Sequence, residues 1–113
     1  MSPAFRSVIF DCDSTLSAIE GIEELAVGHR AEVERLTGLA MQGAVSLESI
    51  YGRRLDLIRP SRKAVDRIGR MYIDRMIPGA PEVVRSLLAE GIRVFILSGG
   101  LLPAVRALGH HLG

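Results

Sequence analysis

Two aspartates, Asp11 and Asp13, stand two positions apart at the end of a short apolar run, Ser7–Phe10. Side chains two positions apart point to the same side of an extended chain, so both carboxylates would face one way and Cys12 the other. Neighbouring carboxylates repel each other unless a cation joins them, and hard oxygen ligands of this kind suit Mg²⁺. The pair therefore predicts a magnesium site, with a solvated turn as the plain alternative.

A second apolar run, residues 92–97, ends in Ser98-Gly99-Gly100. Before a helix, this tripeptide offers a hydroxyl group, unobstructed backbone N–H groups and the positive end of the helix dipole, which are the parts of a phosphate cradle. An ordinary strand-to-helix turn is the alternative. If the two runs are parallel neighbours, both polar segments emerge at the sheet edge where open α/β sheets bind ligands. Carboxylates holding a metal beside such a cradle indicate phosphoryl transfer, in which an aspartate can be the nucleophile.

The spacing of apolar residues predicts the elements that position these groups. Both runs are short and rich in β-branched and aromatic residues, which favours buried strands. Between them the spacing predicts about four helices, a break at 78–81 and a helix that closes near residue 90, and a last helix is expected from about 101 to 111. Eighty-seven residues separate Asp11 from Ser98, whereas a strand–helix–strand unit needs roughly 30. The fold class is therefore α/β, with residues 17–77 as an inserted helical subdomain.

Composition excludes several other classes of protein. The 113 residues are 48% hydrophobic and 24% charged, which is typical of one folded domain. A net charge of +1 gives no reason to expect binding to nucleic acid or to a membrane surface. The single cysteine, Cys12, allows no intramolecular disulfide, and no apolar run approaches the roughly 20 residues that span a bilayer. A cytoplasmic location is the expectation.

Two segments resemble the motifs of a known family. Phe10-Asp11-Cys12-Asp13-Ser14-Thr15-Leu16 resembles the DxDST first motif of haloacid dehalogenase superfamily phosphatases, and Ile96-Leu97-Ser98-Gly99-Gly100 resembles their second motif. The helices between them resemble the small helical cap of the phosphoserine phosphatase group. The resemblance implies a partial Rossmann-like core of residues 1–16 and 78–113, with residues 17–77 as the cap.

The resemblance also implies roles for individual residues. Asp11 would attack phosphorus to give an aspartyl-phosphate, and Asp13 would protonate the leaving oxygen and then activate water. Ser98 and the Gly99 backbone would bind the phosphate. Asp11 and the backbone carbonyl of Asp13 would coordinate Mg²⁺, the implied cofactor.

The implied substrate is phosphoserine or a similar small phosphate, which would connect the protein with serine biosynthesis. Glu20 matches the carboxylate that reads the substrate amino group. Arg54 matches the arginine that grips the substrate carboxylate, with Arg53 as the alternative if the register shifts. An arginine fork suits a carboxylate bidentately. Both Glu20 and Arg54 could instead be solvated helix charges, and a phosphatase with the same cap and another substrate is a rival interpretation.

The family's lysine motif and its Gly-Asp-Gly-x-x-Asp motif would both lie beyond Gly113. The 113 residues alone are therefore expected to be a truncated chain and a poor phosphatase. The rival from another functional class is a non-catalytic chain that binds an anion or oligomerises. Two parallel strands would leave the edge beside Val8 and Ile9 without a neighbour, which predicts a homodimer or another form of self-association.

Overall fold

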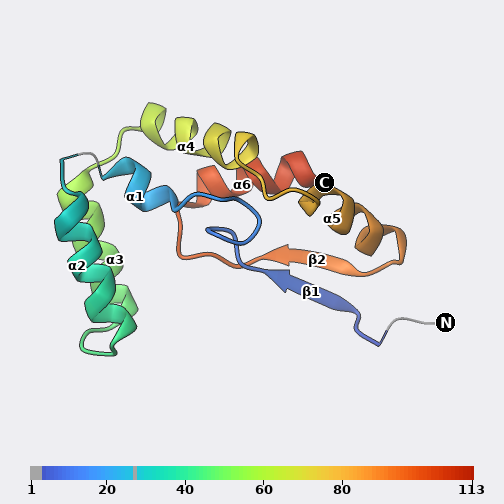
Figure 1. Cartoon of the computed structure of the whole chain (residues 1–113), viewed down its shortest axis with the longest axis horizontal. Coiled ribbons are helices and arrows are strands. Elements are labelled where there is room, and N and C mark those ends of the chain that lie inside the picture. The colour runs from blue at the N-terminus through green and yellow to red at the C-terminus, as the bar shows by residue number, and fades with distance from the viewer. Residues whose placement is uncertain (1–3, 27) are drawn as a thin grey trace.

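The computed structural model describes residues 4–26 and 28–113, so the first three residues of the predicted core segment lie outside the described residues. Strands β1 (Ser7–Phe10) and β2 (Arg93–Ile96) form a parallel pair, and helices fill most of the remaining chain (Figure 1). This arrangement confirms the predicted α/β class. The helices are α1 (Gly21–Leu25), α2 (Arg30–Met41), α3 (Leu47–Ile58), α4 (Arg62–Asp74), α5 (Ala80–Ala89) and α6 (Leu102–Leu112).

Local chemistry explains where several helices begin and end. Ser46 and Ser61 cap α3 and α4, and each hydroxyl oxygen accepts the backbone N–H three residues later, at 3.2 and 3.1 Å. Helix α3 ends at Ile58 and is followed by Arg59, whose φ of 45° is left-handed and which precedes Pro60. Helix α5 follows Gly79, whose φ of 91° favours glycine, and has Pro81 in its first turn.

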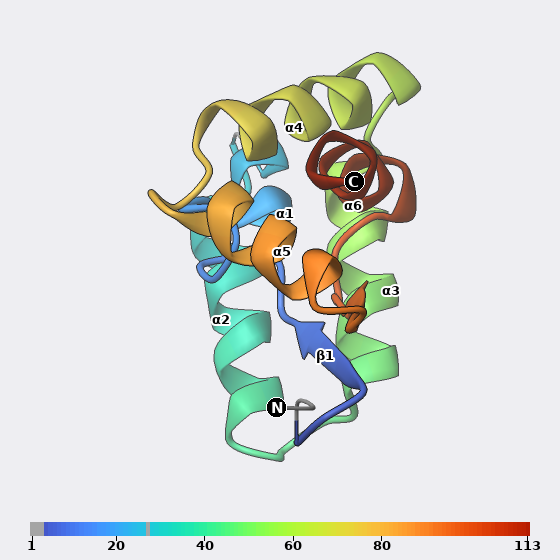
Figure 2. The ribbon, with the colours of Figure 1, turned by 90° about the vertical axis from the view of Figure 1, so that its right-hand side faces the viewer.

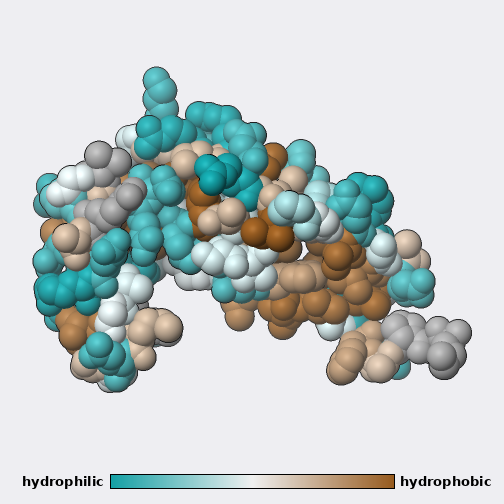
Figure 3. Space-filling model, in the orientation of Figure 1, coloured by the Kyte–Doolittle hydropathy of each residue, from teal (hydrophilic) through white to brown (hydrophobic). Residues whose placement is uncertain are grey.

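The sheet has a covered face and a bare face. Helices α4, α5 and α6 all lie on one side of the strands, while α2 and α3 form a pair beyond the carboxyl ends of the strands (Figures 1 and 2). Phe10 and Ile96 are register partners that pack against the core. The partners Ile9 and Phe95 point the other way and are 64% and 48% exposed. Figure 3 shows this hydrophobic patch over the strands.

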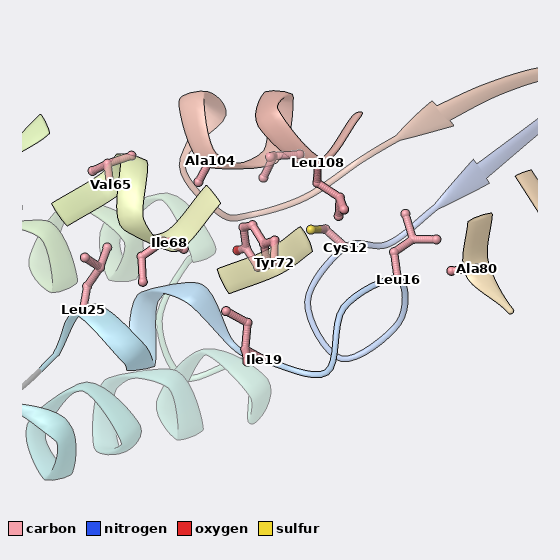
Figure 4. Close-up of a cluster of buried hydrophobic side chains, with 11 residues drawn as sticks. Cys12, Leu16, Ile19, Leu25, Val65, Ile68, Tyr72, Ala80, Ala104 and Leu108 are labelled. Carbon is pink, nitrogen blue, oxygen red and sulfur yellow. The ribbon is translucent and has the colours of Figure 1, made fainter. Parts of the chain in front are cut away.

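The main core lies between α4, α6 and the loop after β1. Tyr72 is at its centre, 1% exposed and surrounded by aliphatic side chains (Figure 4). Helices α4 and α6 approach closely because Gly69 has no side chain, and a Cβ there would lie 3.0 Å from the Cβ of Ala107. Helix α4 belongs to the predicted cap and α6 to the predicted core, so the two segments share one apolar interface. The division at residues 17 and 77 stays a prediction.

No helix among residues 4–26 and 28–113 combines the length and apolar character that crossing a bilayer requires.

We propose that the bare face and edge of the sheet make the 113-residue chain self-associate. Within the described residues β1 and β2 pair only with each other, so each strand keeps an unpaired edge. Light scattering after size-exclusion chromatography should give a mass above that of one chain. Ile9→Lys should shift association to higher concentration, because it places a charge on the bare face. Met41→Lys, a change at an 82% exposed residue at the end of α2, is the matched control. A stable monomer at high micromolar concentration would contradict the proposal.

Cys12 should be an unreactive thiol. Burial raises its pKa to about 12, from an ordinary value near 9, and the charges of Asp13 and Asp11 act in the same direction. Because the folded state keeps the thiol protonated, the free energy of unfolding is unaffected by this group below about pH 9 and falls as the pH rises toward 12. At pH 8 an aromatic disulfide reagent should react slowly with the native chain and rapidly in urea. Because Cys12 is the only cysteine, the signal has a single source. Equal rates in both conditions would show that the loop is open.

Candidate active site

The loop after β1 keeps the alternation that the sequence predicts. Asp11 is exposed, Cys12 is fully buried in the core and Asp13 is half-buried. The Oδ1 atom of Asp11 accepts the backbone N–H of Cys12 at 2.8 Å. The buried thiol therefore anchors the loop, and both aspartates line one pocket on its other side.

Asp13 accepts hydrogen bonds from three separate segments. Its Oδ2 atom accepts the backbone N–H of Gly21 at 2.7 Å and the hydroxyl of Tyr72 at 2.8 Å. Its Oδ1 atom accepts the hydroxyl of Ser98 at 3.3 Å. Gly21 is the first residue of α1, so the carboxylate satisfies an N–H group that a helix leaves unpaired at its start. The side chain of Asp13 thereby joins the β1 loop to α1, α4 and the β2 loop.

The Ser98–Gly100 segment forms a tight turn before α6. The hydroxyl oxygen of Ser98 accepts the N–H of Gly100 at 2.9 Å. A Cβ on Gly100 would lie 3.1 Å from this oxygen and 3.1 Å from the Tyr72 hydroxyl oxygen, which leaves little room for a side chain. Gly99 is exposed at the pocket. The turn therefore presents a hydroxyl group and glycine backbone beside the two aspartates, as the sequence predicts.

Glu20 reaches the same pocket through the loop that precedes α1. Its Oε1 atom accepts the hydroxyl of Ser14 at 2.6 Å. Ser14 has a φ of 59°, a left-handed conformation that few non-glycine residues adopt. This turn directs the chain from Asp13 back toward Glu20.

Arg54, not Arg53, lines the pocket. Arg53 is exposed, while Arg54 is half-buried and its Nη1 donates to the Thr37 hydroxyl at 3.5 Å, a distance at the limit for a hydrogen bond. The Nε atom of Arg54 is buried without a hydrogen-bond partner among the described residues. A buried guanidinium N–H without an acceptor is costly, so this side chain is suited to an anionic ligand.

All the predicted site residues meet at one pocket of about 180 Å³. It contains Asp11, Asp13, Glu20, Arg54, Ser98 and Gly99, together with Ile22, Glu23, Thr37 and Gly100. Thr37 was not predicted, although it stands four residues after the inward-facing Val33 and so on the same side of α2. The placement of these residues agrees with the predicted roles, while the roles themselves stay predictions.

Tyr72 also contacts a site residue, Asp13, in a way that the sequence did not predict. Its position in the apolar spacing of α4 indicates a buried residue but says nothing of its hydroxyl. A buried tyrosine hydroxyl usually has a hydrogen-bond partner. This rule could have indicated that the Tyr72 hydroxyl bonds to a carboxylate of a nearby loop. Burial and the bond to Asp13 raise the pKa of Tyr72 well above its ordinary value, so its hydroxyl stays a donor.

The oxygen atoms at this pocket fit a magnesium ion. The described residues contain no group of three or more histidine, cysteine or acidic side chains placed to hold a metal. Mg²⁺ usually takes only one or two protein carboxylates and completes its shell with water and substrate phosphate. The carboxylate of Asp11 is exposed and available, whereas that of Asp13 already accepts three hydrogen bonds. This difference favours the predicted set, the Asp11 carboxylate and the Asp13 backbone carbonyl.

Comparison with known proteins gives consistent matches. Phosphoserine phosphatase of Bos taurus is 38% identical over 108 residues, which cover 94% of this chain and 48% of that protein. The enzyme of the same name from Mus musculus is 41% identical over 101 residues, covering 88% and 45%. The chain thus spans about half the length of these curated relatives.

Solved structures agree with the sequence matches. A phosphoserine phosphohydrolase-like protein from Francisella tularensis superimposes with a TM-score of 0.83 at 28% identity, covering 96% of this chain and 54% of that one. A phospho-aspartyl intermediate analogue of phosphoserine phosphatase gives 0.81 at 32% identity, covering 98% and 54%. The model of the haloacid dehalogenase-like hydrolase family matches residues 8–113. With the two motifs at one pocket and nearly the whole chain matched, this protein belongs to the haloacid dehalogenase-like hydrolase family.

Proposed function

We propose that this chain carries the nucleophile and substrate-binding half of a magnesium-dependent phosphomonoester hydrolase. One observation supports this above all: Asp11, Asp13 and Ser98 follow neighbouring parallel strands and line one pocket. The phospho-aspartyl analogue of a relative with 32% identity supports the same chemistry.

The proposed reaction has two steps. In the first, a carboxylate oxygen of Asp11 bonds to phosphorus, the ester P–O bond breaks, and the carboxylic acid of Asp13 gives its proton to the leaving oxygen. In the second, the Asp13 carboxylate takes a proton from water as the water oxygen attacks phosphorus. This step breaks the Asp11–phosphorus bond and releases inorganic phosphate. Both aspartates return to their starting states.

The remaining residues would hold the phosphoryl group and the metal. The Ser98 hydroxyl and the Gly99 backbone would bind phosphate oxygens. Mg²⁺, held by the Asp11 carboxylate and the Asp13 backbone carbonyl, would supply positive charge beside the transferred group.

The proposed substrate is phosphoserine or a similar small amino-acid phosphate, which would place the protein in serine biosynthesis. Arg54 would bind the substrate carboxylate, because its guanidinium lines the pocket and its Nε atom has no acceptor among the described residues. Glu20 would bind the amino group from the same pocket. We also propose a cytoplasmic location, which a single, buried cysteine supports.

Asp11→Asn should abolish turnover in a protein that carries these residues together with the family's lysine and Gly-Asp-Gly-x-x-Asp motifs, called the full-length protein below. An amide keeps the shape of the side chain but is a poor nucleophile and a weaker magnesium ligand. Phosphate release measured with Mg²⁺ should be near background, while circular dichroism shows a folded protein. Asp66→Asn, at an exposed position on α4, is the matched control and should keep normal activity. Near-normal hydrolysis by Asp11→Asn would remove Asp11 from the nucleophile role.

Arg54→Ala should raise the KM for phosphoserine by roughly 30- to 700-fold, corresponding to about 2–4 kcal/mol of lost charge-assisted bonding. The KM for a phosphate ester without a carboxylate should change much less. Arg53→Ala is the matched control, because that side chain is exposed and outside the pocket. Equal damage to both substrates would assign Arg54 a structural role and leave the substrate open.

A further inference from the structure

The Tyr72 hydroxyl occupies a site that three segments build around it. Its oxygen lies 2.8 Å from Asp13 Oδ2. A Cβ on Gly21 would collide with this oxygen and lie 2.9 Å from the ring carbon that bears it. A Cβ on Gly100 would lie 3.1 Å from the same oxygen. The hydroxyl therefore sits where α1, the β1 loop and the β2 loop converge, and two of these segments have glycine at the contact.

The two carboxylate oxygens of Asp13 differ in the hydrogen bonds that they accept. Oδ2 accepts two donors at short distance, from Tyr72 and from the Gly21 backbone. Oδ1 accepts the longer bond from Ser98, the residue that begins the proposed phosphate cradle. Two donors on Oδ2 favour placing the carboxyl proton on Oδ1. The arrangement thus presents the exchangeable proton beside the cradle.

We propose that Tyr72 is a positioning residue for the acid–base chemistry of Asp13, an inference that rests on the proposed function. Its hydroxyl holds Oδ2 so that Oδ1 faces the reacting ester oxygen. Because Tyr72 is on α4, this helix supports the acid–base group as well as packing against α6. Tyr72 touches neither substrate nor metal in this role, and it acts only through Asp13.

A purely structural role is the rival explanation, and Ser17 provides the control for it. The Ser17 hydroxyl is buried and donates to the backbone oxygens of Tyr72, at 2.9 Å, and of Arg75, at 3.3 Å. It therefore ties the same end of α4 to the same loop through backbone oxygens and not through the Asp13 carboxylate, although the backbones of Asp13 and Ser17 form an isolated β-bridge. Ser17→Ala removes a buried hydroxyl that bonds to the backbone at the same end of α4. Tyr72→Phe removes the hydroxyl that bonds to the Asp13 carboxylate.

The test measures hydrolysis of two substrates by variants of the full-length protein. Phosphoserine is the alkyl phosphate, and p-nitrophenyl phosphate is the aryl phosphate. The alkoxide leaving group needs a proton from Asp13, whereas p-nitrophenolate leaves without one. The ratio kcat/KM reports steps up to the transfer of phosphorus to Asp11. Tyr72→Phe should lower kcat/KM for the alkyl phosphate by about 10- to 100-fold and that for the aryl phosphate by less than about threefold. Ser17→Ala should leave the ratio between the two substrates unchanged, even if it lowers stability.

A double-mutant cycle on unfolding supplies a readout that is independent of activity. The shift in unfolding midpoint caused by Tyr72→Phe should nearly vanish when Asp13 is already alanine. In an active enzyme, equal losses on both substrates, or no coupling in the cycle, would overturn the role of Tyr72 alone. A folded wild type that hydrolyses neither substrate would instead overturn the proposed function.

Discussion

The carboxylate of Asp13 is the interaction on which the arrangement of this site depends. Its three donors lie 8, 59 and 85 residues away in the sequence, and each belongs to a different segment. A hydrogen bond to a charged group contributes about 1.5–3 kcal/mol, and leaving such a group unpaired at partial burial costs a comparable amount. One short side chain thus holds the start of α1, the end of α4 and the second motif in mutual register. The pocket exists because these segments meet there.

The central position of Tyr72 explains other features of the chain. The ring fills the core between α4 and α6, and the hydroxyl projects from that core to the carboxylate. Gly21 and Gly100 are the positions where its oxygen lies too close for an added side chain. Gly69 likewise leaves room between α4 and α6, because the backbone of Ala104 lies close to where its side chain would be. A helix that belongs by sequence to the predicted cap is therefore fixed to the predicted core by close packing and by a polar contact.

The sequence predicted those features that local patterns control. Alternation along an extended segment placed Cys12 opposite the two aspartates, and the burial of Cys12 confirms it. The family resemblance placed the arginine at Arg54, with Arg53 as the alternative, and Arg54 is the one that lines the pocket. The Tyr72–Asp13 bond could not be predicted in the same way, because no local pattern relates residues 59 positions apart. The N-terminus of α1 escaped prediction for a related reason, since its N–H partner is a carboxylate eight residues upstream instead of a side chain at the cap.

The charges at the pocket constrain any function that involves phosphate. Among the described residues, four carboxyl side chains, those of Asp11, Asp13, Glu20 and Glu23, line it together with one guanidinium, that of Arg54. At an effective dielectric constant of 20, two unit charges 4 Å apart interact with about 4 kcal/mol, so a phosphate dianion would meet net repulsion here. The glycine backbone and the Ser98 hydroxyl supply only partial positive charge. A divalent cation at Asp11 would weaken this repulsion, because it would offset the charge of the carboxylate and attract the phosphate oxygens. The same expectation applies to a chain that only binds anions: the proposed cation would favour phosphate binding at this pocket whether or not turnover follows.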